Sequence, residues 1–447
     1  MNKIKKSIFF LLFILLINCS FDDKTGIWTG TEKEEKRISQ LEENQNRNIV
    51  NIYSSEAIYD REMPLDKTIS ISNPKNNISW KMSGLNHQNF LGNIYLSGID
   101  NIFLKKKIGK NKFSTSKIIS SPLVFNNNII FSDNTGTIFN ISQSGEINWK
   151  KNIYKKIYKR IYKSLVFSIY QNNIYVADNI GFIYSIDLIS GKIIWIKNHG
   201  IPLKSNIRIY DDKIFLINQD NRIFCLNIKN GSKISDIRLA SSFIKLQNFL
   251  STAISKQGEI ITLTTSGDLL KINASNGRIF WSFNALESTL AHAADFFKSS
   301  KIVLTEDDII FSVKSAIFSL NLNTGYIKWK RKVSSVDAPI VYGKNIFILT
   351  DNGFFVIIDK NTGKIISSHN ILKILKKRHQ ETEITGFIMG SGKIYSVTSN
   401  GYLIVSSAVS GKVEYFKKIG DPVITSPIIN DGKLYILTKN SRILGFN

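Results

Sequence analysis

The sequence predicts an all-β fold, an eight-bladed β-propeller built from four-stranded antiparallel blades. Three observations support this prediction: a strand-turn-strand pattern that recurs along the 447 residues, a glycine in the turn of each copy, and a further strand pair ahead of each copy. The clearest copy is 181–195, where side chains alternate with a period of two, as in a strand packed between two apolar layers. Its turn runs from Asp187 to Gly191, and the glycine supplies the positive φ that the turn needs.

The pattern returns at nearly constant spacing, close to the roughly 40 to 45 residues of one propeller blade. Further copies occupy 136–149, 222–235, 267–281, 316–329, 353–367 and 401–415, and the turn glycines are Gly145, Gly191, Gly231, Gly277, Gly325, Gly363 and Gly411. A single hairpin cannot bury both of its faces, so the copies are expected to stack. Four copies carry a tryptophan in the second strand, Trp149, Trp195, Trp281 and Trp329, which we interpret as structural repeat residues.

Each copy follows another strand pair, for example 164–177, 339–350 and 424–438, which gives four strands per blade. The last blade is incomplete, because 423–446 contains three strands before the chain ends. An unpaired edge is a liability, so a strand from the N-terminal part should close the ring. We expect 101–108 to do so, with Leu104 where other repeats place Trp; 78–82 is the second choice. Counting from Ser120 then gives about eight blades.

The first 18 residues have the pattern of a secretory signal, with Lys3, Lys5 and Lys6 ahead of an apolar core that is short for a membrane span. The motif Leu16-Ile17-Asn18-Cys19 resembles the lipobox of bacterial lipoproteins, which implies a lipidated Cys19; Asn18 departs from the small residue preferred there, and plain secretory cleavage is the alternative. Ser20 favours an outer-membrane destination. Polar residues 19–77 are predicted to be a partly disordered tether, and 78–447 the propeller.

Composition fits one large exported domain. Cys19 and Cys225 are the only cysteines, so no disulfide is expected, and Cys225 is predicted to be a buried strand residue. The net charge of +24 accompanies abundant Lys, Ile and Asn throughout, which suggests a genome-wide bias. Two segments are locally basic, 154–163 and 373–378. They could meet an acidic partner domain or anionic headgroups, or they could be solvated loops. Nucleic acid is not an expected partner of an exported protein.

The repeat signature Asp/Asn-x-x-Ser/Thr-Gly-x-x-x-Trp resembles the quinoprotein-like (PQQ-like) propeller repeat. Dehydrogenases that bind pyrroloquinoline quinone share this repeat with the BamB family of outer-membrane assembly lipoproteins. The lipobox and the propeller size resemble the BamB family, as do the strand-opening motifs Ser120-Ser121-Pro122, Asp337-Ala338-Pro339 and Thr425-Ser426-Pro427 and the C-terminal Asp431-Gly432-Lys433-Leu434-Tyr435. The resemblance covers 80–447.

The dehydrogenase alternative implies adjacent cysteines, a calcium site of Glu, Asn and Asp, a catalytic Asp and long pocket-forming insertions. This sequence has no adjacent cysteines and mostly short connections, and many of its carboxylates fall in turns, such as Asp211-Asp212 and Asp307-Asp308. Its five histidines, His87, His199, His292, His369 and His379, show no metal-ligand spacing. We therefore expect no catalytic residue, no metal and no cofactor.

The BamB resemblance implies a non-enzymatic scaffold of the outer-membrane β-barrel assembly (BAM) complex, which binds the POTRA domains of BamA and assists insertion of β-barrel proteins. Two neighbouring loops, 237–250 and 286–300, would make that contact through Arg238, Leu246 and Asp295. Cys19 would anchor the scaffold to the periplasmic side of the outer membrane. A periplasmic glycan- or peptide-binding propeller remains a third alternative, with Tyr154, Tyr158 and Tyr162 as exposed aromatics at the channel mouth.

Overall fold

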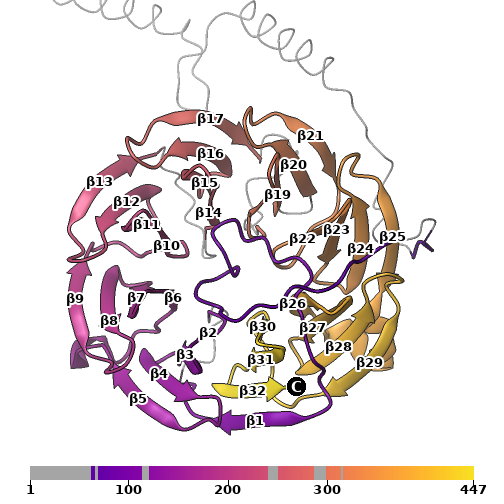
Figure 1. The fold of residues 1–447 in the computed structure, drawn as a ribbon, viewed down its shortest axis with the longest axis horizontal. Coiled ribbons are helices and arrows are strands. Elements are labelled where there is room, and N and C mark those ends of the chain that lie inside the picture. Colours follow the sequence, from indigo (N-terminus) through magenta and orange to yellow (C-terminus); the bar gives the residue numbers. More distant parts are fainter. Residues whose placement is uncertain (1–61, 66–68, 113–119, 240–249, 286–298, 314–315) are drawn as a thin grey trace, which may run out of the picture. The chain divides into compact units, whose positions relative to one another are not determined.

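The computed structural model describes residues 62–65, 69–112, 120–239, 250–285, 299–313 and 316–447. Within these residues the chain forms eight four-stranded antiparallel sheets arranged as a ring around a central channel (Figure 1). The predicted fold class is confirmed. The segment 1–61, which contains the predicted signal, Cys19 and most of the predicted tether, lies outside the described residues. None of the helices among the described residues is long and apolar enough to span a bilayer.

The first four blades follow the chain from the inner to the outer strand. Blade 1 is β2 (Leu123–Phe125), β3 (Asn128–Ser132), β4 (Thr137–Ser142) and β5 (Ile147–Asn152). Blade 2 is β6 (Leu165–Tyr170), β7 (Asn173–Asp178), β8 (Phe182–Asp187) and β9 (Ile193–Asn198). Blade 3 is β10 (Arg208–Tyr210), β11 (Lys213–Ile217), β12 (Arg222–Asn227) and β13 (Lys233–Arg238). Blade 4 is β14 (Thr252–Ile254), β15 (Glu259–Leu263), β16 (Asp268–Asn273) and β17 (Ile279–Asn284).

The other four blades complete the ring. Blade 5 is β18 (Val303–Leu304), β19 (Asp308–Val313), β20 (Ala316–Asn321) and β21 (Ile327–Arg331). Blade 6 is β22 (Ile340–Tyr342), β23 (Asn345–Leu349), β24 (Phe354–Asp359) and β25 (Ile365–Asn370). Blade 7 is β26 (Ile384–Gly390), β27 (Lys393–Thr398), β28 (Tyr402–Ser407) and β29 (Val413–Lys418). Blade 8 is β30 (Ile428–Asn430), β31 (Lys433–Leu437), β32 (Arg442–Phe446) and β1 (Ile102–Lys107). Two 3-10 segments, η2 (Lys156–Tyr158) and η4 (Ile371–Glu381), lie in connections between blades.

The strand predicted to close the ring does so. β1 pairs antiparallel with β32, with Lys105 opposite Leu444 and Lys107 opposite Arg442. This pairing gives the last blade its outer strand and removes an open edge. The second-choice segment 78–82 has another role, because Trp80 bridges to Val124 on the inner strand of blade 1.

Neighbouring blades are joined by a side chain from one outer strand that lies over the turn glycine of the next blade. The indole of Trp149 covers Gly191, and its Nε1 donates a hydrogen bond of 2.9 Å to the Leu188 carbonyl. The same joint pairs Trp195 with Gly231, Trp281 with Gly325 and Trp329 with Gly363, with Nε1 donating at 3.2, 3.3 and 2.7 Å to the carbonyls of Ile228, Leu322 and Lys360. These glycines have positive φ, so both the backbone and the stacked ring exclude a side chain.

Where the tryptophan is missing, another residue of the same strand takes its place. Blade 3 has Ser235 at this position, and Ile237, two residues further on the same face of the strand, covers Gly277. Blade 6 has Ser367, and His369 covers Gly411. In the closing strand, Leu104 covers Gly145, as its alignment with the tryptophans predicts. The joint thus depends on filling the space above the glycine more than on the indole.

Basic residues reinforce several joints. Two positions after the residue at the Trp position, a lysine or arginine reaches a carbonyl of the next blade's turn or, for Lys417, the carbonyl just before β1. These donors are Lys106 to Gly145 at 2.8 Å, Lys151 to Gly191 at 3.2 Å, Arg331 to Thr362 at 2.8 Å and Lys417 to Ile99 at 3.2 Å. The sequence suggests that the high lysine content is a compositional bias. Some of these lysines, however, hold neighbouring blades together.

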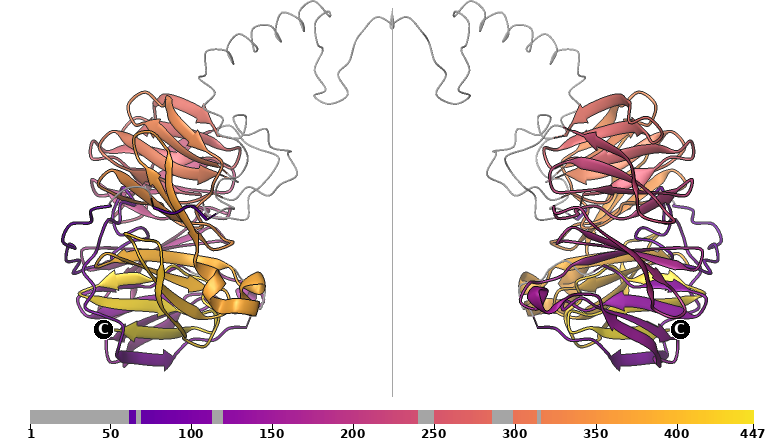
Figure 2. Two further views of the ribbon diagram at one scale, coloured as in Figure 1. Left: turned by 90° about the vertical axis from the view of Figure 1, so that its right-hand side faces the viewer. Right: turned by 90° about the vertical axis from the view of Figure 1, so that its left-hand side faces the viewer.

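Residues 75–97, which we call the plug, lie across the channel on one face of the ring, shown in indigo in Figure 1. Main-chain hydrogen bonds connect the plug to inner strands: Trp80 to Val124 of β2, Lys81 to Ile169 of β6, His87 to Ile254 of β14, Gln88 to Leu304 of β18 and Ile94 to Met389 of β26. Inner strands have an unpaired edge toward the channel, and the plug supplies partners for it. We call this side the plug face and the opposite side the loop face (Figure 2).

Arg208 of β10 fixes the plug from below. It is fully buried, and its guanidinium donates to the carbonyls of Ser83 (2.9 Å) and Thr252 (2.8 Å) and to the Asn89 side chain. Burial lowers the pKa of Arg208 to about 10, which leaves it charged at neutral pH. Ahead of the plug, Met63 exchanges main-chain hydrogen bonds of 2.8 and 3.1 Å with Ser368 on the outer edge of β25. Contacts with the ring thus begin before residue 78, the predicted start of the propeller.

The joint predicts unequal effects for two glycine substitutions. Gly325 (φ +74°) lies under the Trp281 ring, whereas Gly343 (φ +57°) has open space around it. Gly343→Ala should lower the free energy of unfolding by about 1 kcal/mol through backbone strain alone. Gly325→Ala should lower the free energy of unfolding by about 2 to 3 kcal/mol more than Gly343→Ala does, because the added methyl group displaces the indole. Urea unfolding followed by tryptophan fluorescence measures both values; equal losses would contradict the proposed joint.

A second prediction concerns the plug. Arg208→Met should lower the free energy of unfolding by about 3 kcal/mol, since it leaves several buried carbonyl oxygens without a donor. Amide hydrogen exchange of 83–89 should accelerate more than exchange of the outer strands. The exposed Arg278 provides the control, because Arg278→Met should change neither quantity. Unchanged exchange in 83–89 would show that Arg208 does not hold the plug.

Candidate partner-binding surface

One of the three predicted partner-binding residues can be located. Arg238 is the last residue of β13 in blade 3, opposite Arg222, and its side chain is exposed. Leu246 and Asp295 lie outside the described residues, as do most of the two loops predicted to carry the contact. Of those loops, the structure describes 237–239, 250, 299 and 300.

The described residues bring the bases of both loops together. Ser251 directly follows the first loop, and its hydroxyl accepts a hydrogen bond of 2.7 Å from the backbone N–H of Ile302, just beyond the second loop. Leu250 is buried and bridges to Ser205 of the preceding connection. Both loops link the outer strand of one blade to the inner strand of the next, so their bases lie on the loop face. The two loops therefore end at adjacent points, which agrees with the prediction that they are neighbouring inter-blade loops.

Charge near Arg238 is mostly compensated. The Asp236 carboxylate pairs with Arg222 and with Lys233, the latter at 3.1 Å. Burial raises the pKa of Asp236, but its hydrogen bonds to Arg222 and Lys233 outweigh this and hold the pKa below its ordinary value. Arg238 forms no ion pair with a described residue. Its exposed guanidinium could therefore meet a carboxylate of another molecule.

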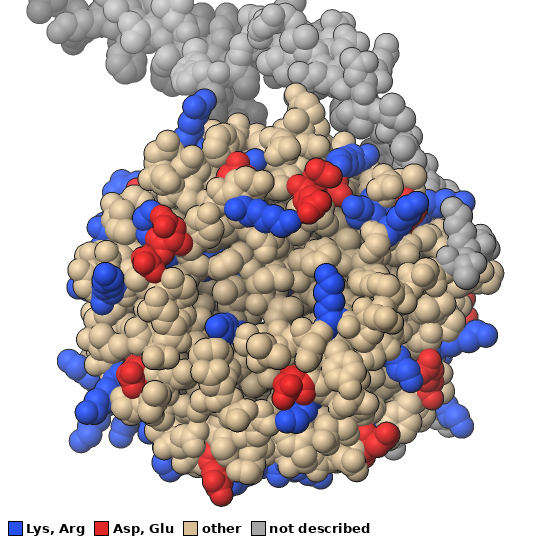
Figure 3. Space-filling model, viewed as in Figure 1, with Lys and Arg blue, Asp and Glu red and all other residues tan. Residues whose placement is uncertain are grey.

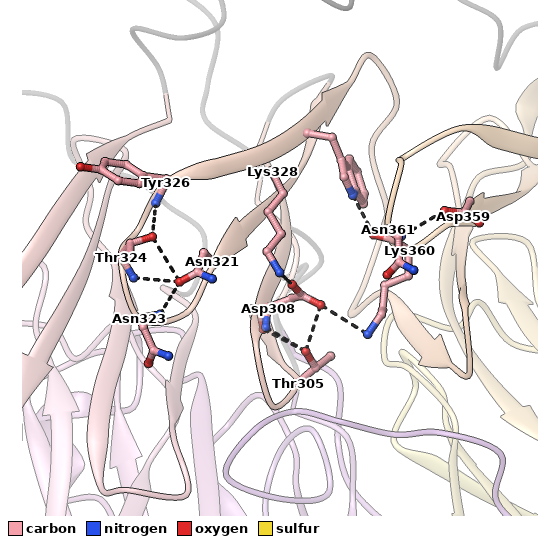
Figure 4. A network of polar contacts seen from close by, with 11 residues as sticks. Thr305, Asp308, Asn321, Asn323, Thr324, Tyr326, Lys328, Asp359, Lys360 and Asn361 are labelled. Atoms are coloured by element: carbon pink, nitrogen blue, oxygen red, sulfur yellow. Dashed lines mark hydrogen bonds and ion pairs between the residues drawn. The ribbon is translucent and has the colours of Figure 1, made fainter. Parts of the chain in front are cut away.

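Carboxylates that could suggest an enzyme have structural partners. Asp308 is buried in blade 5 and pairs with Lys328 of the same blade and with Lys360 of blade 6 at 3.4 Å, while Thr305 contributes hydrogen bonds (Figure 4). Asp211 pairs with Lys213 at 2.8 Å, and Asp212 accepts a hydrogen bond of 2.9 Å from Tyr170. These contacts hold turns and blades in place.

Histidine and cysteine side chains that the structure describes do not assemble into a reactive cluster either. Burial and the nearby Arg208 lower the pKa of His87, a plug residue, to about 4, and burial also lowers that of His199. Burial raises the pKa of the Cys225 thiol, which lies in β12 as a buried strand residue. Among the described residues no three or more His, Cys, Asp or Glu side chains gather in a way that could hold a metal ion.

The loop-face end of the channel is crossed by a polar chain. Lys301 of the connection before blade 5 contacts Asp337, before blade 6, at 2.7 Å. Asp337 accepts a hydrogen bond from Ser426, before blade 8, and the Ser426 carbonyl accepts one of 2.8 Å from Ser121, before blade 1. Since the plug lies at the other end, the channel is spanned by protein groups at both ends.

Two of the three tyrosines proposed for glycan or peptide stacking, Tyr154 and Tyr158, point inward. Tyr154 donates a hydrogen bond of 2.6 Å to Asp178, and its ring contacts the rings of Tyr158 and Tyr184. Tyr158 packs edge-on against Phe182. Tyr154, Tyr158 and Tyr162 are each only partly exposed, so they do not form the open aromatic platform that this alternative requires.

Comparison with known proteins yields a family. The family model described as outer membrane protein assembly factor BamB matches residues 134–369, just over half of the chain. Curated relatives include the outer membrane protein assembly factor BamB of Moranella endobia, 21% identical over 294 residues (60% of this chain and 71% of the relative), and that of Yersinia pestis, 20% identical over 289 residues (59% and 69%).

Solved structures show the same fold. The crystal structure of BamB from Moraxella catarrhalis superposes with a TM-score of 0.61 and 11% identity, over 77% of this chain and all of that one. A quinohemoprotein alcohol dehydrogenase from Pseudomonas putida superposes with a TM-score of 0.63 and 9% identity, over 83% and 80%. The ring architecture is therefore common to binding proteins and enzymes, and the fold alone does not distinguish them.

Sequence reasoning missed the plug and the role of Arg208. The plug contacts each inner strand through one or two residues only, so it has no strand-like periodicity. Arg208 did carry a signal, since it interrupts the apolar run Ile207-Arg208-Ile209 in a strand that should be buried. A charged residue at such a position needs several buried acceptors.

Protonation of Asp337 should affect stability in acid. Burial raises its pKa, but Lys301 and Ser426 outweigh burial and hold the pKa below the ordinary value. A lowered pKa means that the contact stabilises the fold above about pH 4 and that this stabilisation is lost as the pH falls through the lowered pKa. Asp337→Asn should therefore cost about 2 kcal/mol at pH 7 and progressively less below pH 4.

Denaturant unfolding from pH 7 to pH 3 measures this difference. The control is Asp211→Asn, whose exposed pair with Lys213 should contribute under about 1 kcal/mol at any pH. A penalty for Asp337→Asn that stays constant between pH 7 and pH 3 would contradict the assignment.

Proposed function

The chain belongs to the family of the outer membrane protein assembly factor BamB, and on this premise we propose that it is an accessory scaffold of the machinery that assembles β-barrel proteins in the outer membrane. The match to the BamB family model over residues 134–369 carries the proposal, because it runs from β4 of blade 1 into β25 of blade 6 and includes the repeat residues between them. The scaffold acts by binding, and it performs no chemistry of its own.

The channel supports a non-enzymatic role. A quinone-dependent dehydrogenase needs a cavity for its cofactor and converging carboxylates around a cation. In this protein the plug occupies one end of the channel, and the polar contacts from Lys301 to Ser121 occupy the other. The buried carboxylates Asp308 and Asp337 are paired with lysines. The loops between blades remain as the variable surface, and such loops carry partner contacts in propellers.

We assign the partner contact to the loop face at blades 3 to 5, and BamA through its POTRA domains as the partner. The contact consists of Arg238, Leu246 and Asp295, an apolar centre with one cation and one anion, which is a composition common in small hot spots. Two observations support this assignment: Arg238 is exposed at the end of β13, and the hydrogen bond between Ser251 and Ile302 brings the C-terminal ends of the two loops together.

Attachment to the membrane is assigned to Cys19. Lipidation there, after removal of residues 1–18, holds the protein at the periplasmic face of the outer membrane, and the polar residues that follow serve as the tether. The mass of the mature N-terminus tests this assignment directly. An N-terminus without acyl groups would contradict the anchor but not the partner contact.

The partner assignment predicts the behaviour of a double variant. Arg238→Ala with Asp295→Ala should reduce recovery of BamA in pull-downs from solubilised membranes by tenfold or more, since truncating a hot-spot residue costs about 2 kcal/mol. Thermal unfolding should stay unchanged, because Arg238 is exposed. Arg278→Ala, an exposed arginine in a turn on the plug face, should leave recovery unchanged.

Undiminished recovery of BamA by the double variant would reject these contacts. If the unaltered chain recovers no BamA, the scaffold proposal itself fails. A quinone absorbance band that depends on calcium would instead favour an enzyme.

A further inference from the structure

The basic connection between blades 1 and 2 has an unusual construction. Residues 153–163, which we call the prong, protrude on the loop face around η2 (Figure 2). Ile157 is 78% exposed and Ile161 is 45% exposed. Between and beside them lie Lys155, Lys156, Lys159 and Arg160, all exposed.

An exposed isoleucine is not informative by itself. Here, however, the surrounding chain is held firmly. Tyr154 is tied to Asp178, Tyr158 packs on Phe182, and Asn179 donates 3.1 Å to the Tyr162 carbonyl. Lys163, the last residue of the prong, is buried and donates a hydrogen bond to the Tyr158 carbonyl. Tyr154 and Tyr158, four residues apart, turn inward, while the two isoleucines and the four cations are exposed.

None of the four exposed cations of the prong forms an ion pair with a described residue. No Asp or Glu occurs from 147 to 177, and Asp178, the nearest downstream acid, is buried beneath Tyr154. By contrast, Figure 3 shows Lys and Arg on the plug face mixed with Asp and Glu around the circumference. On the loop face, η4 repeats the combination more weakly: Ile374 is 40% exposed, but the adjacent Lys373 pairs with Glu62.

We propose that the prong binds an anionic lipid surface, with Ile157 and Ile161 inserted between headgroups and the four cations at headgroup level. Amphipathic segments with apolar tips and flanking lysines bind membranes in this way. A protein partner fits less well, since protein interfaces are depleted in Lys and use Tyr or Trp as anchors, whereas the tyrosines of the prong are turned away. The proposal depends neither on Cys19 nor on the assembly partner.

Fluorescence of a polarity-sensitive label tests the proposal. The full chain carries Ile157→Cys with the label attached and is reconstituted into vesicles of phosphatidylglycerol or of phosphatidylcholine. The matched control carries the label at Ile189→Cys. Ile189 is 77% exposed on the turn between β8 and β9, which lies on the plug face, opposite the prong. The chain without an added cysteine reports any labelling of Cys19 or Cys225.

At position 157, phosphatidylglycerol should shift the emission to shorter wavelength and allow quenching by lipid-borne quenchers, while phosphatidylcholine should have little effect. About 1 M salt, where the Debye length is about 3 Å, should abolish the shift. Replacing Lys155, Lys156, Lys159 and Arg160 by Gln should weaken the association several hundredfold, since each cation contributes about fivefold, and return the emission to its value in water. Aqueous emission at 157 in phosphatidylglycerol, or an equal shift at 189, would overturn the proposal.

Discussion

The fold depends on the joint in which a side chain of one outer strand lies over the turn glycine of the next blade. A blade alone leaves both of its faces exposed, so the ring is stable only when all neighbours are in place. The joint sets their spacing, because the positive-φ glycine lets the backbone turn tightly and leaves room for a ring above it. Trp, Ile, His and Leu all fill this space, and Leu104 brings the N-terminal part of the chain into the last joint. Closure of the ring therefore couples the first strand to the last.

The centre of the ring imposes a different constraint. Most inner strands are two or three residues long and face the channel with unpaired main-chain groups. Water could satisfy these groups, but here the plug does so. The buried charge of Arg208 is satisfied by the carbonyl oxygens of Ser83 and Thr252 in place of a counter-ion. Because the plug occupies one face, the longer inter-blade connections of the other face are the variable surface. The two faces of the ring thus have separate roles, one in closing the channel and one in contact with other molecules.

The sequence predicted the elements that repeat and missed those that do not. Seven copies of one pattern reveal the blades even though no single copy is decisive, and the missing strand of the last blade identified β1. The plug could not be found in this way, since its contacts are single main-chain bonds to different strands and leave no periodic trace. The candidate partner residues depend on loops with no repeat at all: Arg238 could be placed because it ends a strand, whereas Leu246 and Asp295 lie outside the described residues. The inward tyrosines of the prong were likewise hidden, because the sequence shows their spacing but not the Asp178 carboxylate that orients Tyr154.

The net charge of +24 shows why position matters more than composition. Lys106, Lys151 and Lys417 are committed to carbonyl groups across the joints, and Lys328 and Lys360 share the buried Asp308. These cations are bonded within the protein and contribute little to binding other molecules, although each adds to the net charge as much as an exposed lysine does. The four exposed cations of the prong differ because no Asp or Glu occurs from 147 to 177 and because bonded and packed neighbours hold them beside exposed isoleucines. A cation whose side chain is already bonded cannot also bind a partner at little cost, so the basic residues that act on other molecules are those that the fold leaves without an internal acceptor.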